Sequence, residues 1–187
     1  MRIGIYGGTF DPIHNGHLIL AREALEMLEL ERVIFVPAAA SPFKGAPAAS
    51  SEIRLSMLRT AIDGENGFAI DDCELHRPPP SYAIDTVREM QRREKGADLY
   101  YLIGEDNVSD LPRWHRFPEL QTMVHFVVLN RTGLKSTHDY AVVERKINIS
   151  ATDIRNRVAS GRSIRYLVPA EVEEIIRRQN IYREKER

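Results

Sequence analysis

Two histidines near the N-terminus, His14 and His17, are the residues best suited to chemistry on phosphate. They stand in the segment 7–18, GGTFDPIHNGHL, between a short apolar run and an amphipathic stretch. That order predicts a strand, a glycine-rich turn and a helix start, where backbone N–H groups and the helix dipole favour anions. Because the spacing is three, both imidazoles fall on one face of the first helical turn. The segment therefore predicts a phosphate site, in which Gly16 lets a phosphate approach the backbone closely.

The same two histidines allow two other interpretations. An H-x-x-H pair also occurs on metal-binding helices, and Asp11 would offer a further ligand. Alternatively, the two imidazoles have only a structural role. The Gly-Gly-Thr turn before them favours phosphate. We therefore expect no protein metal site.

A second helix start is predicted at 149–155, which reads ISATDIR. Ser150 and Asp153 have the spacing of a capping box, which by itself predicts only a helix N-terminus. Arg155 would lie in the first turns of that helix, where the dipole already favours anions. Together, Ser150, Thr152 and Arg155 predict a second phosphate-binding helix start.

Further candidates follow the apolar runs of the sequence. Lys44 lies where a closing loop would bring charge onto a polyphosphate, although a loop lysine is usually only solvated. Asp106, after Gly104, has the position of acidic residues that hold a ribose hydroxyl. Trp114, the only tryptophan, is by default a core residue, and its alternative role is stacking on a flat ring. Arg131 is another phosphate candidate.

The elements that would position these residues alternate between strands and helices. Four short apolar runs fit strands buried on both faces of a parallel sheet, at 3–6, 33–36, 100–103 and 126–129. Helical patterns lie between them, at 18–30, 51–63 and 82–94, the last after a Ser81 cap. This order predicts an α/β doubly wound parallel sheet, with its site at the carboxyl ends of the strands.

Length and composition predict one domain over 1–187, with 149–182 as a small helical part that carries the second phosphate motif. A net charge of −1 gives no sign of a nucleic-acid surface, and no apolar run reaches the length of a membrane span. With Cys73 as the only cysteine, a reducing compartment is expected. We therefore expect a cytoplasmic protein that binds small molecules and neither nucleic acid nor membrane. A homo-oligomer is an open alternative.

Both helix starts resemble signatures of a known superfamily. Residues 7–18 resemble the T/H-x-G-H signature of the nucleotidyltransferases, and 149–155 resembles their I-S-x-T-x-I-R signature. More narrowly, the sequence resembles nicotinate mononucleotide adenylyltransferases from 2 to about 182, through 7–18 and through Val36-Pro37, Pro42-Phe43-Lys44, Glu74-Leu75, Arg77, Ser81-Tyr82, Gly104, Asp106 and Trp114. The resemblance implies a Rossmann-like fold and transfer of AMP from ATP to nicotinate mononucleotide in NAD biosynthesis. The products would be deamido-NAD and pyrophosphate, and we expect Mg²⁺ to arrive with ATP.

The resemblance also implies roles for individual residues. His14 and His17 would bind the ATP phosphates, with His17 nearest the reacting α-phosphate. Lys44 and Arg155 would neutralise the triphosphate and the departing pyrophosphate. The other expected ATP-binding residues are Gly7, Gly8, Thr9, Phe10, Gly16, Ser150 and Thr152. The expected nicotinate mononucleotide-binding residues are Ser81, Tyr82, Gly104, Asp106, Trp114, His115 and Arg131, with Trp114 stacked on the nicotinate ring.

Two positions depart from the family pattern. Phe43 stands where the family usually has a histidine that contacts the triphosphate. Ala83 stands where a threonine is implicated in binding the nicotinate carboxylate, which leaves the preference for acid over amide open. Backbone N–H groups near Trp114 and His115 are alternative donors. Other readings are an adenylyltransferase for nicotinamide mononucleotide, phosphopantetheine or FMN, a dual-specificity enzyme, a nucleotide sensor without turnover, and a metallohydrolase.

Overall fold

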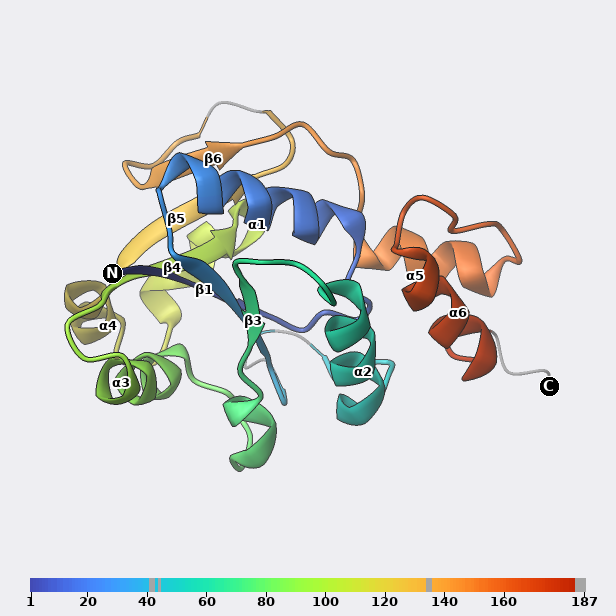
Figure 1. Ribbon diagram of the computed structural model, residues 1–187, viewed down its shortest axis with the longest axis horizontal. Helices are drawn as coiled ribbons and strands as arrows, with labels where there is room; N and C mark the ends of the chain where they lie inside the picture. Colours follow the sequence, from blue (N-terminus) through green and yellow to red (C-terminus); the bar gives the residue numbers. More distant parts are fainter. Residues whose placement is uncertain (41–42, 44, 134–135, 184–187) are drawn as a thin grey trace.

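A six-stranded parallel sheet forms the centre of the computed structural model, which describes residues 1–40, 43, 45–133 and 136–183. The strand order is β3-β2-β1-β4-β5-β6 (Figure 1). Every neighbouring pair is parallel. The strands are β1 (Arg2–Gly8), β2 (Arg32–Pro37), β3 (Phe68–Ile70), β4 (Asp98–Gly104), β5 (His125–Asn130) and β6 (Ala141–Glu144). This is the predicted doubly wound arrangement.

Helices cover both faces of the sheet. They are α1 (Asn15–Met27), α2 (Ser51–Ala61), α3 (Ala83–Arg93), α4 (Phe117–Met123), α5 (Ala151–Ala159) and α6 (Ala170–Arg178), with 3₁₀ segments η1 (Cys73–His76) and η2 (Glu105–Arg113). Helices α1 and α2 pack on one face, and α3 and α4 pack on the other. Helices α5 and α6 lie to one side of the sheet, beside α2 (Figure 1).

The four predicted strands and the predicted helices are confirmed, with shifts of a few residues at their ends. The sequence did not indicate β3, β6 or α4, which have three, four and seven residues and are too short for a clear periodicity. The predicted Ser81 cap is wrong. The N-cap of α3 is Tyr82, and the Ser81 hydroxyl instead accepts a hydrogen bond of 3.1 Å from the Ala39 N–H.

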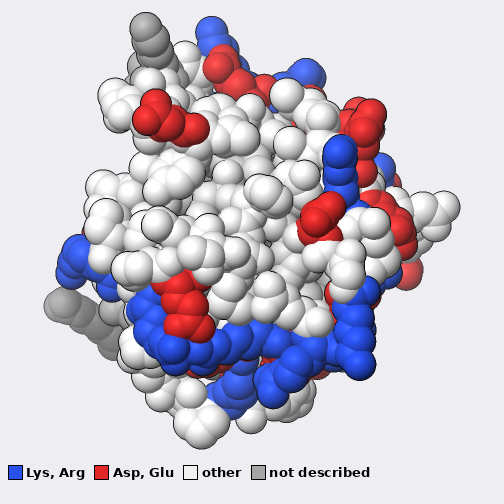
Figure 2. Space-filling model, turned by 90° about the vertical axis from the view of Figure 1, so that its left-hand side faces the viewer, with Lys and Arg blue, Asp and Glu red and all other residues white. Residues whose placement is uncertain are grey.

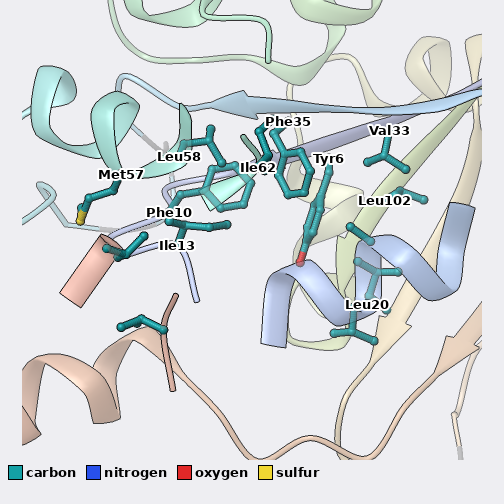
Figure 3. Close-up of a cluster of buried hydrophobic side chains, with 14 of the residues drawn as sticks. Tyr6, Phe10, Ile13, Leu20, Val33, Phe35, Met57, Leu58, Ile62 and Leu102 are labelled. Atoms are coloured by element: carbon teal, nitrogen blue, oxygen red, sulfur yellow. The ribbon is translucent and has the colours of Figure 1, made fainter. Parts of the chain in front are cut away.

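Alternate residues of each strand enter two separate hydrophobic clusters. Tyr6 pairs in register with Phe35 and with Leu102, and all three lie in the cluster beneath α1 and α2 (Figure 3). Ile5 is one residue earlier, so it faces the cluster beneath α3 and α4. Burial on both faces explains why the strands read as continuous apolar runs rather than as alternating ones.

The topology brings the candidate segments together at one edge of the sheet. The chain runs outward from β1 to β3 on one side and then returns to place β4 on the other side of β1. The carboxyl ends of β1, at Gly8, and of β4, at Gly104, therefore flank the topological switch point. Ligands of doubly wound sheets bind in the crevice outside such a point.

The helices near the C-terminus are tied to the start of α1. The backbone N–H of Asn15 donates to the carbonyl of Leu167 at 2.9 Å, and its side-chain amide donates to the carbonyl of Tyr166 at 2.8 Å. The second of these bonds joins residues 151 positions apart. The start of α1 is thereby held next to the segment between α5 and α6.

Charges on the face shown in Figure 2 lie mainly around a broad uncharged centre, with Lys and Arg side chains gathered along its lower margin. In helix α3, Arg88 and Arg93 form ion pairs with Glu119 and Asp71. The charges of these two arginines are thus balanced locally. Within the described part of the chain, no helix combines the length and apolar character needed to cross a bilayer.

We predict that Leu102→Ala lowers the free energy of unfolding by about 2–5 kcal/mol, because it leaves a cavity beside Tyr6 in the centre of the sheet. Urea denaturation measures the change. Met27→Ala is the control, since 58% of the Met27 side chain is exposed and its truncation should change stability by no more than about 0.5 kcal/mol. Equal losses in the two variants would contradict this account of the core.

Candidate active site

His14 and His17 form a reciprocal cap at the start of α1. The Nδ1 of His14, the N-cap residue, accepts from the backbone N–H of His17 at 3.3 Å. In return, Nδ1 of His17 accepts from the backbone N–H of His14 at 3.3 Å. The two rings stack with centroids 3.6 Å apart and an interplanar angle of 17°. This confirms that the imidazoles share one face of the first turn.

The cap fixes the tautomer of each neutral ring. Because Nδ1 accepts in both residues, the ring proton of each neutral imidazole sits on Nε2. His14 is only 2% exposed, and burial, reinforced by the positive charge of Arg131, lowers the pKa of His14 to about 3. The pair can therefore offer N–H donors to an anion at neutral pH, and His14 does so without carrying a positive charge.

Gly16 makes room for this arrangement. A Cβ atom at Gly16 would lie 3.0 Å from His14 Nδ1. A side chain at this position would crowd the imidazole of His14, and close approach of a phosphate to the Gly16 backbone stays a prediction. Phe10 and Tyr6 meet the outer side of His17 edge-on, with ring centroids 5.2 Å and 6.0 Å away. Phe10 adopts a left-handed backbone, with φ of 49°, to reach this position.

The second predicted helix start is also present. The Ser150 hydroxyl caps α5 by accepting from the Asp153 N–H at 3.1 Å. Arg155 donates through Nη1 to the carbonyl of Asp11 at 2.7 Å and through Nη2 to the Thr152 hydroxyl at 3.2 Å. Arg131 donates to the carbonyl of Ile149 at 3.0 Å. Arg155 thus fastens α5 to the motif that follows β1, and Arg131 fastens the residues just before α5 to the end of β5.

Asp106 and Arg131 belong to the same charged neighbourhood as the histidines. The pKa of the Tyr6 hydroxyl is raised mainly by burial and further by the negative charge of Asp106, while Arg131 acts in the opposite direction. Arg131 also acts electrostatically on His14. Gly104 lies against Asp106, because a Cβ there would be 2.5 Å from Asp106 Oδ1. These residues gather at the carboxyl end of β1 and β4.

A pocket of about 360 Å³ opens beside that cluster. It is lined by Gly7, Gly8 and Thr9 after β1, by Ser81, Tyr82 and Ala83 before α3, by Trp114 and His115 after η2, and by Ala38, Phe43, Glu74, Tyr101, Ile103, Asn107 and Arg113. Four of the residues expected to hold nicotinate mononucleotide therefore line the same pocket: Ser81, Tyr82, Trp114 and His115. Gly104, Asp106 and Arg131 do not line this pocket in the described part of the chain.

Aromatic rings form much of the pocket wall. Tyr82 and His115 stack with centroids 4.4 Å apart. Trp114 meets Tyr101 edge-on at 5.9 Å and also packs against the cluster beneath α3 and α4. The tryptophan thus combines its default core role with a position on the pocket. Phe43, where the family pattern has histidine, lies under the guanidinium of Arg113, with 5.2 Å from the ring centroid to Cζ.

Several buried polar residues of the site have partners that the sequence did not indicate, and Asp11 was considered there only as a metal ligand. Asp11 is 5% exposed, and its carboxylate accepts bonds from the N–H groups of Ala48 and Ala49, at 2.7 Å and 3.2 Å, and from the Tyr182 hydroxyl at 2.6 Å. Arg54 is 1% exposed and donates to the carbonyl of Thr9 at 2.7 Å. Their partners are distant in sequence, so no local spacing indicated them.

The burial and hydrogen bonds of another carboxyl group, Glu74, were likewise not indicated by local spacing. It lines the pocket with only 4% of its surface exposed, and it accepts from the Thr86 hydroxyl at 2.5 Å. Arg77 donates to that hydroxyl at 2.5 Å. Burial raises the pKa of Glu74, and hydrogen bonds from Thr86 and Ser81 oppose the rise. The sequence pointed to Glu74 and Arg77 only through the family resemblance.

Comparison with known proteins agrees with this arrangement. Residues 5–157 match the profile of the Cytidylyltransferase-like family, a match that spans both helix starts. This match covers more than half of the chain, so the chain belongs to this family of nucleotidyltransferases.

Curated relatives narrow the assignment. Proteins from Gemmatimonas aurantiaca and Shouchella clausii are 41% and 43% identical to the chain and cover 98% and 97% of it, and the matches span 93% and 96% of those proteins. A protein from Exiguobacterium sibiricum is 40% identical, with 97% of this chain and 99% of that protein covered. All three bear the name "Probable nicotinate-nucleotide adenylyltransferase". The chain is a member of the nicotinate-nucleotide adenylyltransferase family.

Solved structures share the fold. Nicotinic acid mononucleotide adenylyltransferase of Plasmodium falciparum, complexed with NaAD, superposes with a TM-score of 0.82 at 18% sequence identity and covers 97% of each chain. The same protein complexed with APC gives a TM-score of 0.78 at 17% identity, covering 97% of this chain and 96% of that chain. The predicted Rossmann-like architecture is therefore confirmed.

We predict that His14 makes stability fall in mild acid. With a folded pKa of about 3 and an ordinary value of 6.5, the unfolded chain binds a proton below pH 6.5 that the folded chain does not. Lowering the pH from 7 to 5 should therefore remove about 2 kcal/mol of unfolding free energy through this residue.

His14→Asn is the matched variant, because asparagine keeps a capping side chain and does not titrate in this range. Urea denaturation at pH 7 and at pH 5 should show a smaller acid-induced loss for the variant than for the original protein. If both proteins lose stability equally, His14 is not the buried neutral group described above.

Proposed function

We propose that this protein transfers AMP from ATP to nicotinate mononucleotide and releases deamido-NAD and pyrophosphate, a reaction of NAD biosynthesis. The observation that carries this proposal is the meeting of two capped helix starts, at His14 and Ser150, beside an aromatic pocket at the switch point of the sheet. The helix starts suit phosphate groups, and the pocket suits a flat ring with a polar substituent. The names of the relatives support the same reaction.

The mechanism we propose is direct in-line attack by the substrate phosphate on the α-phosphorus of ATP. That nucleophile is already ionised at neutral pH, so a general base is not required. Catalysis then depends on orientation and on donors aimed at the developing charge. His17 donates to the α-phosphate, and His14 supports it from the buried side. Arg155 offsets charge on the triphosphate and on the departing pyrophosphate, with Ser150 and Thr152 beside it.

Lys44 is assigned the same charge-neutralising role by its place in the sequence alone, because it lies outside the described residues. The remaining expected ATP contacts, Gly7, Gly8, Thr9, Phe10 and Gly16, belong to the segment around the histidines. Gly104, Asp106 and Arg131 are proposed to hold the rest of the nucleotide. The charged neighbourhood that links Asp106, Arg131 and Tyr6 supports this assignment.

We also propose that Mg²⁺ enters the site with ATP, bound to the triphosphate. The chemistry it would supply is neutralisation of phosphate charge. Between the described residues, no three His, Cys, Asp or Glu side chains lie together in a way that could hold a metal ion. Asp11, the carboxylate beside the histidines in sequence, is instead engaged by three donors from the protein.

The first prediction from this mechanism concerns His17. His17→Ala should lower kcat at least about a hundredfold, as expected for loss of a donor to the transition state. Pyrophosphate release measures the rate, and thermal unfolding establishes that the variant is folded. His125→Ala is the control, because His125 is an exposed imidazole at the amino end of β5, opposite the site. A folded His17→Ala enzyme with near-normal kcat would exclude this role.

The second prediction concerns the choice between acid and amide. Parallel assays with nicotinate mononucleotide and nicotinamide mononucleotide should show pyrophosphate release with a preference for the acid. Ala83 stands where the family has a threonine, whose hydroxyl is implicated in binding the nicotinate carboxylate. In this protein, backbone N–H groups at the start of α3 and near His115 would donate to that carboxylate instead. Ala83→Thr, on the pocket wall, should then increase the preference.

The outcomes of these assays separate the alternatives. Equal rates with the two substrates would identify a dual-specificity enzyme and assign the relaxed preference to Ala83. No pyrophosphate with either substrate would contradict the proposed reaction and favour the other acceptors or a nucleotide sensor.

A further inference from the structure

We infer that Tyr182 is a positioning residue for the ATP side of the site, acting through Asp11. This inference rests on the proposed function, and it adds to that function a residue outside both signature motifs. Tyr182 follows α6, and its hydroxyl donates to Asp11 Oδ1 at 2.6 Å across 171 positions of sequence. Its side chain also packs against the hydrophobic cluster beneath α1 and α2.

Asp11 connects Tyr182 to the residues before α2 and to Arg155, a proposed ATP-side group. Its carboxylate also holds the N–H groups of Ala48 and Ala49, which lie just before the N-cap of α2. Its backbone carbonyl accepts the bond from Arg155. The position of Asp11 therefore affects both the residues before α2 and the place of the Arg155 guanidinium.

The bond from Tyr182 is suited to this task. Asp11 is 5% exposed, and a buried carboxylate needs donors to offset its lost hydration. The Tyr182 hydroxyl stays protonated, because burial and the neighbouring Asp11 both raise its pKa. Among the described residues, Oδ1 without that donor keeps only the longer bond, of 3.2 Å, from Ala49. The carboxylate is then free to turn toward other donors, and the groups attached to it move.

The nicotinate side of the site is built from other elements. Apart from the turn at Gly7–Thr9, its walls come mainly from the residues before α3 and after η2, and Asp11, Ala48, Ala49 and Tyr182 are not among the lining residues. A change at Tyr182 should therefore weaken the use of ATP while leaving the second substrate unaffected. A residue that merely stabilised the fold would reduce the amount of active enzyme and change neither KM.

The test is Tyr182→Phe, which keeps the ring packing and removes only the hydroxyl. We expect KM for ATP to rise about tenfold, the scale expected for loss of a hydrogen bond to a charged group, with KM for nicotinate mononucleotide within about twofold of its original value. Tyr166→Phe is the matched control and should change neither constant. Tyr166 also has a left-handed backbone, but its side chain is 76% exposed. Equal changes in both KM values, or none, would overturn the inference.

Asp11→Asn supplies a double-mutant cycle. If Tyr182 acts through Asp11, the losses of kcat/KM for ATP in Tyr182→Phe and Asp11→Asn should be strongly non-additive. Additive losses would show that the tyrosine acts by another route and would contradict the inference.

Amide hydrogen exchange gives a readout independent of turnover. The N–H groups of Ala48 and Ala49 should exchange faster in Tyr182→Phe than in the original protein, while those of α4 remain unchanged. Unchanged protection at Ala48 and Ala49 would refute the inference even if the enzyme were slower. If the original protein releases no pyrophosphate and Ala48 and Ala49 still exchange faster in Tyr182→Phe, the proposed function is refuted. The structural connection from Tyr182 through Asp11 to Ala48 and Ala49 then stands.

Discussion

The buried carboxylate of Asp11 is the interaction on which the geometry of the site depends. It is almost removed from water, and three donors from two distant parts of the chain, Ala48-Ala49 and Tyr182, offset the lost hydration of its charge. The backbone carbonyl of Asp11 accepts a further bond, from Arg155. One residue thereby joins the turn after β1, the residues before α2, the helix start of α5 and the segment after α6. Precise placement of catalytic groups requires this kind of support, because small displacements of the reacting groups reduce rates strongly.

Burial also decides the charge of the histidine at the start of α1. His14 is buried and feels the positive charge of Arg131, and both factors favour the neutral imidazole. The reciprocal cap with His17 leaves Nε2 of each neutral ring as the donor. Because His14 donates without a charge, the pair beside a helix N-terminus can bind phosphate without adding two positive charges to a region that already holds arginines. The structural reading of the histidine pair and the phosphate reading are therefore compatible, because the cap that orients the rings also prepares their donors.

The site has two halves that share the turn after β1. The phosphate half depends on α1, α5 and the Asp11 contacts, and the aromatic half depends on the residues around Tyr82 and Trp114. The two positions that depart from the family pattern, Phe43 and Ala83, both line the aromatic pocket. The Phe43 ring meets Arg113 at a position where the family pattern has a triphosphate contact, so this departure concerns ATP. Ala83 concerns the second substrate.

By itself, the sequence determined the parallel α/β sheet, the two helix starts and the order of the candidate segments, because strand burial, capping and glycine-rich turns are local signals. It also indicated, through the family resemblance, seven residues that line the pocket: Gly7, Gly8, Thr9, Ser81, Tyr82, Trp114 and His115. Only the tertiary structure decided how Asp11, Arg54, Glu74 and Tyr182 are used, because each bonds to partners far away in sequence. It likewise decided that Gly16 accommodates an imidazole and that Ser81 bonds to a neighbouring loop rather than capping α3. The physical reason is that a buried polar group must find donors wherever the fold brings them, and the sequence near that group does not record where they come from.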